Sequence, residues 1–173
     1  SLPELGIIRR ELSLGQIFDP ARQRITALLG ADGDLFPAMM GPAEVLTTEA
    51  GPGIFVRAHS FRSPRGQSLY RVDPTSGRVR QAEYMSRDVE DYILDPSGQS
   101  AAHSEYDQVT KVWSLHLRQG GQLRETWRTT APVDTPGLVG LGMNGDSVIV
   151  AADRPDLSRE GREDAEYFNV NLE

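Results

Sequence analysis

Residues 68–84 read SLYRVDPTSGRVRQAEY, and this stretch decides the fold class. Two β-prone runs, 68–72 and 78–84, flank the turn sequence Asp73-Pro74-Thr75-Ser76-Gly77. Asp-Pro opens a turn because proline presets φ and the aspartate side chain bonds to nearby backbone N–H groups. Gly77 can adopt the positive φ that closes such a turn. The stretch therefore predicts a β-hairpin with a loop of about four to five residues.

The same strand–turn–strand pattern recurs along the whole chain. Turns with longer polar flanks lie at Asp19, Asp73 and Gly120, and turns that follow a short apolar strand lie at Gly41, Asp95 and Asn144. Both series advance by about 50 residues and lengthen in the same interval, as expected of one repeated unit. A four-stranded antiparallel unit of this length is typical of a β-propeller blade.

We therefore predict an all-β fold of four-stranded antiparallel blades that form a partial, incomplete β-propeller. Residues 1–173 are expected to be a single all-β fragment of a longer protein, because closed propellers consist of complete blades. The predicted blades are 15–28 (the end of one blade), 36–84 and 91–128 (two full blades) and 138–172 (an incomplete blade). Strands are predicted at 36–40, 44–58, 68–72 and 78–84, at 91–94, 100–106, 111–117 and 122–128, and at 138–141, 147–152 and 166–172.

Composition excludes several classes of protein. The 17 glycines and 11 prolines among 173 residues favour turns over a helical bundle. A net charge of −7 argues against a nucleic-acid partner, which needs a basic surface. No apolar run approaches the roughly 18 residues of a membrane span, so no membrane partner is expected. The absence of cysteine excludes disulfides and thiolate chemistry, and it is compatible with both a cytoplasmic and a periplasmic location.

Three turn-centred segments carry a family resemblance: 69–78 read LYRVDPTSGR, 91–98 read DYILDPSG and 139–145 read VGLGMNG. Together with 35–40, they resemble the N-terminal β-propeller of the prolyl oligopeptidase family of serine peptidases, in particular its acylaminoacyl-peptidase-like branch. The resemblance implies a non-catalytic domain that covers the active site of a missing α/β-hydrolase domain and restricts access to short peptides during proteolysis. The alternative is a propeller-type interaction or binding scaffold unrelated to peptidases.

We predict no catalytic residues, so the chain as given is not expected to be an enzyme although its parent would be a hydrolase. Ser147 follows Gly145 but lacks the second glycine of a Gly-x-Ser-x-Gly elbow, and a β-prone run follows it instead of a helix. No cofactor is expected either. Residues 140–145 fit the formula Gly-x-Gly-x-x-Gly, but they precede a predicted strand, whereas a dinucleotide site needs a helix there.

The strongest candidate metal ligands are His103, Glu105 and Asp107, which would share one face of a strand because side chains alternate. Since spacing alone specifies little, we predict a structural polar strand here and no bound metal. The segment Asp32-Gly33-Asp34 has Ala43 where a calcium loop needs an acid, which favours a simple turn. The other histidines, His59 and His116, are assigned no role.

Two further features concern packing and partners. The charged segment 154–166 is interpreted as a solvated loop, with contact to a hydrolase domain as the alternative. Incomplete blades would leave sheet edges that favour self-association, above all at 166–172, where Phe168 and Val170 alternate with polar residues. The aromatic residues at predicted strand positions are expected to pack between blades rather than bind a ligand. They are Tyr70, Tyr84, Tyr92, Tyr106, Trp113 and Trp127.

Overall fold

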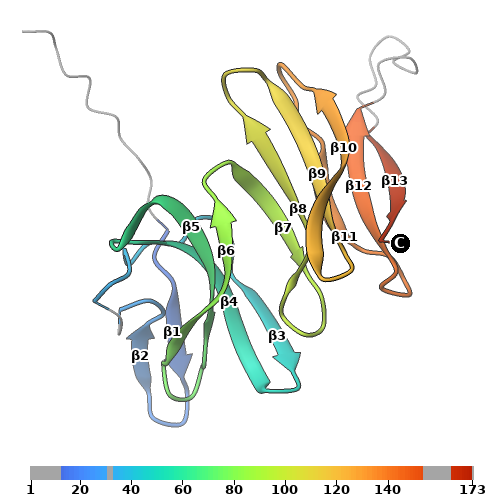
Figure 1. Cartoon of the computed structure of the whole chain (residues 1–173). Helices are drawn as coiled ribbons and strands as arrows, with labels where there is room; N and C mark the ends of the chain where they lie inside the picture. The colour runs from blue at the N-terminus through green and yellow to red at the C-terminus, as the bar shows by residue number, and fades with distance from the viewer. Residues whose placement is uncertain (1–12, 31–32, 154–164, 173) are drawn as a thin grey trace, which may run out of the picture. The chain divides into compact units, whose positions relative to one another are not determined.

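The computed structural model describes residues 13–30, 33–153 and 165–172, and every regular element in these ranges is a β-strand (Figure 1). Thirteen strands form four sheets of two, four, four and three strands. The prediction of an all-β fold built from small antiparallel sheets is confirmed. These described residues contain no helix long and apolar enough to cross a membrane.

The chain divides into two compact units. The first comprises Ser1–Leu46 and Pro52–Tyr84, and the second comprises Thr47–Gly51 and Met85–Glu173. Two sheets lie mainly in the first unit. They are the hairpin of β1 (Gln16–Asp19) with β2 (Arg24–Ala27), and the sheet of β3 (Glu44–Thr48), β4 (Gly51–Ser60), β5 (Ser63–Val72) and β6 (Val79–Ser86).

The second unit holds the remaining two sheets. In both, the spatial order of the strands follows their order along the chain. One consists of β7 (Val89–Leu94), β8 (Ser100–Asp107), β9 (Val112–Gln119) and β10 (Gln122–Thr130). The other consists of β11 (Gly137–Leu141), β12 (Ser147–Asp153) and β13 (Ala165–Asn171).

The predicted strands in 36–58 are wrong in detail. The chain reverses at Glu49-Ala50, so the single strand predicted at 44–58 is in fact β3 and β4. The segment 36–40 is not a regular strand, although the N–H groups of Phe36 and Met40 donate hydrogen bonds to the carbonyl oxygens of His59 and Arg57 in β4. Because β5 occupies the opposite edge of β4 there, 36–40 lies on the edge that β3 occupies further along.

Aspartate side chains close four of the hairpins. In each turn an Oδ1 atom accepts a hydrogen bond from the N–H group two residues further on, at 2.8–3.0 Å. The Asp-Pro turns at Asp19, Asp73 and Asp95 were predicted, and they are confirmed. The fourth turn, at Asp107, has no proline; it lies between the strands predicted at 100–106 and 111–117, but its aspartate cap was not predicted. Gly120 and Gly121 both adopt positive φ, 58° and 82°, as a two-residue hairpin loop requires.

Each unit has its own hydrophobic core. In the first, buried residues of β4 and β5 pack with Leu28, Leu29 and Leu35. In the second, the core lies between the β7–β10 and β11–β13 sheets and joins Trp113, Leu115 and Leu117 to Val148 and Val150. Trp113 is buried in this core, and its ring centroid lies 5.3 Å from that of Trp127 on the neighbouring strand of the same sheet, so this contact leaves the expected packing between blades a prediction. Tyr84 departs from it, because 59% of this residue is exposed.

Candidate functional site

Two central strands of the β7–β10 sheet place two imidazoles and one carboxylate side by side. His103 on β8 is paired directly with His116 on β9. Glu105 lies two residues beyond His103, so its side chain leaves the same face of β8. Neighbouring residues on paired strands share a face, which brings all three side chains together. This group, His103, Glu105 and His116, is hereafter the His–Glu–His cluster.

The carboxylate of Glu105 lies between the two imidazoles. Its Oε1 atom is 3.6 Å from Nε2 of His103, and its Oε2 atom is 3.6 Å from Nε2 of His116. The two rings are tilted by 36°, with centroids 4.8 Å apart. One ligand atom from each of the three residues lies within 4.8 Å of the others. Among the residues that the structure describes, this is the one group with that property.

Two serines contact the cluster. The hydroxyl of Ser86, at the end of β6, donates a 2.7 Å hydrogen bond to Oε1 of Glu105. The hydroxyl of Ser114 lies 3.2 Å from Nε2 of His116. The Ser86 contact restricts the rotamer of the carboxylate, so part of the geometry is organised before any ligand arrives. The Ser114 hydroxyl lies at the same nitrogen of His116 that faces Glu105, so a ligand bound to this nitrogen would displace that contact.

His103 is the most buried member, with 8% of its surface exposed. Burial, and to a lesser extent the neighbouring His116, lower the pKa of His103 to about 4, while Glu105 acts in the opposite direction. The imidazole is therefore neutral near pH 7. Neither ring nitrogen has a hydrogen-bond partner among the described residues.

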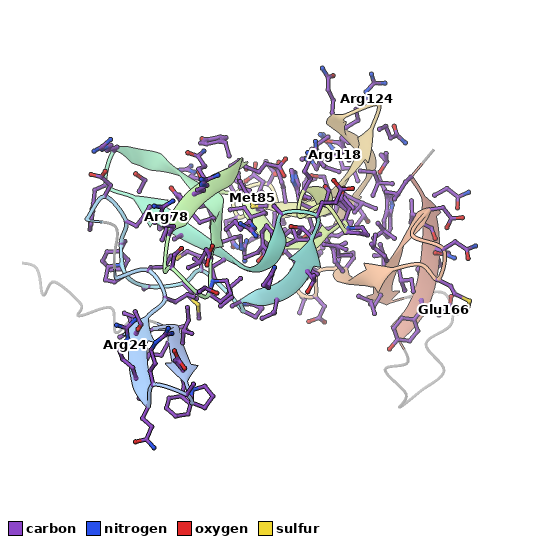
Figure 2. All side chains as sticks on the ribbon, turned by 90° about the horizontal axis from the view of Figure 1, so that it is seen from below. Arg24, Arg78, Met85, Arg118, Arg124 and Glu166 are labelled. Carbon is purple, nitrogen blue, oxygen red and sulfur yellow. The ribbon has the colours of Figure 1, made fainter. Side chains whose placement is uncertain are left out.

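Positive charge near the cluster comes from Arg118, which adds to the lowering of the His103 pKa. Arg118 and Arg124 lie on the β9–β10 hairpin (Figure 2). The guanidinium of Arg118 donates hydrogen bonds to the carbonyl oxygens of Ser100 at 2.7 Å and Gly121 at 2.9 Å. These hydrogen bonds keep the guanidinium group of Arg118 close to backbone carbonyl oxygens, which partly balance its positive charge.

The sequence predicted His103, Glu105 and Asp107 as the candidate metal ligands. The structure brings His103 and Glu105 together, but Asp107 is not part of the cluster. Asp107 ends β8 and caps the following turn, where it accepts hydrogen bonds from the N–H groups of Val109 and Thr110. His116 takes its place in the cluster. The β8–β9 hairpin closes at Asp107 and Val112, and this register pairs His103 with His116. His116 could therefore have been predicted only from the register of the hairpin, because no local sequence motif marks it.

The other candidates occupy structural positions. Ser147 begins β12 directly after the β11–β12 turn and is 2% exposed, and its hydroxyl donates a 3.2 Å hydrogen bond to the carboxylate of Asp146. The glycine-rich run 140–145 forms the end of β11 and this turn, with Gly145 at φ 73°. Asp34 forms a 2.5 Å ion pair with Arg62. Asp32 and 154–164 of the charged segment lie outside the described residues.

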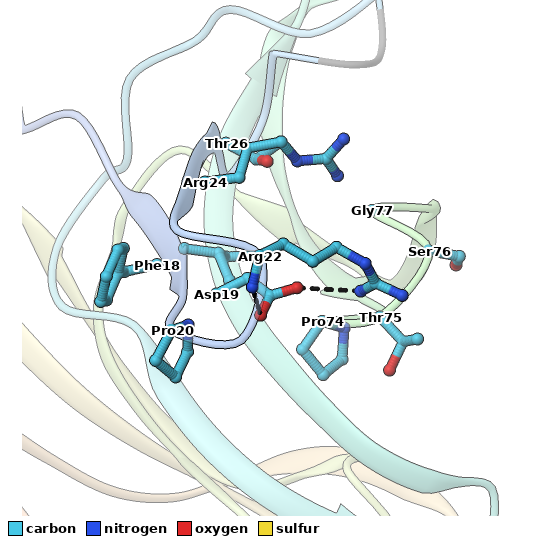
Figure 3. Close-up of a pocket in the computed structure, with 11 residues that line it drawn as sticks. Phe18, Asp19, Pro20, Arg22, Arg24, Thr26, Pro74, Thr75, Ser76 and Gly77 are labelled. Atoms are coloured by element: carbon cyan, nitrogen blue, oxygen red, sulfur yellow. Dashed lines mark hydrogen bonds and ion pairs between the residues drawn. The ribbon is translucent and has the colours of Figure 1, made fainter.

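A shallow groove of about 320 Å³ lies beside the β1–β2 hairpin in the first unit (Figure 3). The turn at Pro74-Thr75-Ser76-Gly77 forms its other wall. Arg22 and Asp19, both in the β1–β2 turn, line the groove and form a 2.9 Å ion pair with each other. Phe18 and Ile25, paired across β1 and β2, are 60% and 62% exposed. The hairpin thus presents apolar and basic side chains together.

Comparisons with known proteins add no assignment: no protein-family model and no curated protein matches this chain.

Proposed function

We propose that this chain is the non-catalytic β-propeller portion of a serine peptidase of the prolyl oligopeptidase type. The observation that carries the proposal is the repetition of one sheet design. The β3–β6 and β7–β10 sheets each contain four strands whose spatial order follows the chain order. Propeller blades have this up-and-down arrangement.

Sheet packing within the second unit supports the same proposal. One face of the β7–β10 sheet is buried against the β11–β13 sheet through Leu115, Leu117, Val148 and Val150. Successive sheets of a propeller pack through such apolar faces. The turns at Asp73 and Asp95 fall within two of the segments that carry the family resemblance.

In this proposal the chain contributes no nucleophile, base or oxyanion hole. Its role is to cover the active site of an α/β-hydrolase domain elsewhere in the parent protein and to admit short peptides. The contacts of Ser147 agree with a structural role, since its hydroxyl is buried and donates to Asp146.

Labelling with a fluorophosphonate probe tests the proposal. The chain of 173 residues should stay unlabelled and should not cleave chromogenic aminoacyl or acyl-peptide substrates. The longer natural protein should label at a serine within a Gly-x-Ser-x-Gly motif outside this segment. Stoichiometric labelling of Ser147, or a natural protein that carries no reactive serine, would contradict the proposal.

A second candidate function is an interaction scaffold unrelated to peptidases. The exposed pair Phe18 and Ile25 beside Arg22 favours it, because exposed apolar side chains on a hairpin are a common feature of interaction surfaces. In that case the natural protein would lack a reactive serine, and Phe18→Ser would weaken capture of its partner.

A further inference from the structure

We propose that His103, Glu105 and His116 form a binding site for a divalent transition-metal ion of the zinc type. The proposal does not depend on the peptidase assignment. The sequence alone led to the expectation that no metal is bound, because it offered only residues of one strand. The pairing of β8 with β9 supplies a ligand from a second strand, as metal sites commonly require.

The chemistry of the three side chains matches this class of ion. Two imidazoles and one carboxylate are a frequent set of protein ligands for zinc, which leaves a fourth position for water or another ligand. Imidazole nitrogen favours zinc, copper, iron and nickel over magnesium and calcium, which prefer a shell of oxygen atoms. The ligand set therefore indicates a transition metal.

The distances in the cluster are close to those that a bound ion needs. Zinc bonds of about 2.0–2.2 Å in a tetrahedron place neighbouring ligand atoms about 3.3–3.6 Å apart. The two imidazole–carboxylate separations are both 3.6 Å. The largest separation within the set is at most 4.8 Å, so a small rotation of one ring completes the triangle. Both strands are central in their sheet, which holds the Cα positions in place.

A second observation points to a ligand. His103 is 92% buried, and within the part of the chain that the structure describes neither Nδ1 nor Nε2 has a hydrogen-bond partner. The 3.6 Å separation from Glu105 is too long for a hydrogen bond. Buried polar atoms without partners are rare and call for an explanation such as an ion or an ordered water. A metal bond from one nitrogen of His103 provides that explanation.

The surroundings favour metal binding over a purely structural ion pair. Ser86 donates to Oε1 of Glu105, an outer-shell contact of the kind that orients metal-binding carboxylates. Glu125, which is paired with His116 across β9 and β10, is already held by Arg128 through hydrogen bonds of 2.9 and 2.6 Å. The three cluster residues are therefore the expected ligands. Arg118 is a nearby positive charge that would repel a bound cation.

Titration with metal tests the proposal on the intact chain. Protein treated with chelator and then dialysed should bind one Zn²⁺ per chain by calorimetry. Co²⁺ should give visible d–d bands that are typical of a tetrahedral site with nitrogen and oxygen ligands. Zinc should raise the thermal midpoint of the wild-type protein, because binding to the folded state stabilises it by mass action.

Variants separate the cluster from adventitious binding. His116→Gln and Glu105→Gln should each abolish stoichiometric binding and the Co²⁺ bands, whereas Ser86→Ala should weaken binding by about tenfold. His59→Gln, in β4 of the first unit, is the matched control and should bind as wild type. Circular dichroism establishes that each variant folds. Absence of 1:1 binding, or binding that survives both cluster variants, would overturn the proposal.

Discussion

Trp113 is fully buried in the core between the two sheets of the second unit. Trp113→Ala removes a large apolar surface from this core and leaves a cavity that neighbouring side chains cannot fill. We expect a loss of about 3–5 kcal/mol in the free energy of unfolding, measured by urea denaturation. Val109→Ala is the control, because Val109 lies in a turn and is 90% exposed, and it should change stability by less than about 0.5 kcal/mol.

Gly142 is needed for a steric reason. A Cβ atom at this position would overlap Oγ of Ser147, which is itself buried. Gly142→Ala should therefore lower the free energy of unfolding by about 1–3 kcal/mol. Gly137→Ala, where an added Cβ would meet open space, should have little effect.

A double variant tests whether that clash is the cause. Ser147→Ala removes the overlapping atom, and the remaining contacts of the added Cβ are at 3.4 Å. The pair Gly142→Ala with Ser147→Ala should be more stable than Gly142→Ala alone. A double variant in which both losses simply add would show that the glycine serves another purpose.

At the scale of elements, aspartate-capped turns link stability to pH. Backbone N–H groups, first that of Ser76 and then that of Thr75, lower the pKa of Asp73. The pKa of Asp107 is lowered in the same way by Thr110 and Val109, and that of Asp19 chiefly by the side chain of Arg22. A carboxyl whose pKa is lower in the folded than in the unfolded state stabilises the fold at pH values above its unfolded-state pKa. This stabilisation is lost as the pH falls through the folded-state pKa.

We therefore expect the urea midpoint to be steady between about pH 5 and 7 and to fall below about pH 4, since the unperturbed value for aspartate is 3.8. Asp73→Asn keeps an acceptor in the turn but removes the charge, so it should make the fall at acid pH shallower. Asp134→Asn, in the exposed segment after β10, serves as the comparison. An unchanged acid profile in Asp73→Asn would show that the turn carboxylates do not set it.

Hairpins with strong turn chemistry could be predicted from the sequence. Asp-Pro and glycine at Asp73, Asp95 and Gly120 located β6 to β10 to within two residues, whereas β5 begins at Ser63, five residues before the predicted run 68–72. The reversal at Glu49-Ala50 has no such signal before Gly51, so β3 and β4 were merged into one predicted strand. Local propensity marks a turn only where special residues occupy it, and here strand pairing decides instead.

The candidate site was predicted only in part for a related reason. His103 and Glu105 share a strand face by simple alternation, which the sequence displays directly. His116 joins them through the register of β8 with β9, which depends on where the intervening turn closes. Asp107 looked equivalent to Glu105 in spacing, but its carboxylate is engaged by the turn that sets this register.

At the scale of the whole molecule, the edge strand β13 should promote self-association. Phe168 faces inward and is half-buried, and Val170 and Leu172 pack on the core, as the alternation predicted. Among the strands that the structure describes, β13 has a partner, β12, on one side only. Such edges invite pairing with another chain. Sedimentation equilibrium at micromolar concentration should reveal a reversible dimer.

A charged residue on this strand should weaken that association. Asn169→Lys adds a charge to the exposed face of β13, a device by which natural edges resist pairing. Asn144→Lys adds the same charge in the β11–β12 turn and should leave the association constant unchanged. A wild-type chain that is strictly monomeric would remove the basis for this prediction.

We propose that the sheets are successive blades of one propeller. Residual dipolar couplings of backbone amides, measured on the aligned chain in solution, give the orientation of each sheet directly. If they are blades, the β3–β6, β7–β10 and β11–β13 sheets should be related by similar rotations about one common axis. Sheets whose orientations share no such axis, or a β3–β6 sheet that tumbles independently of the others, would contradict it.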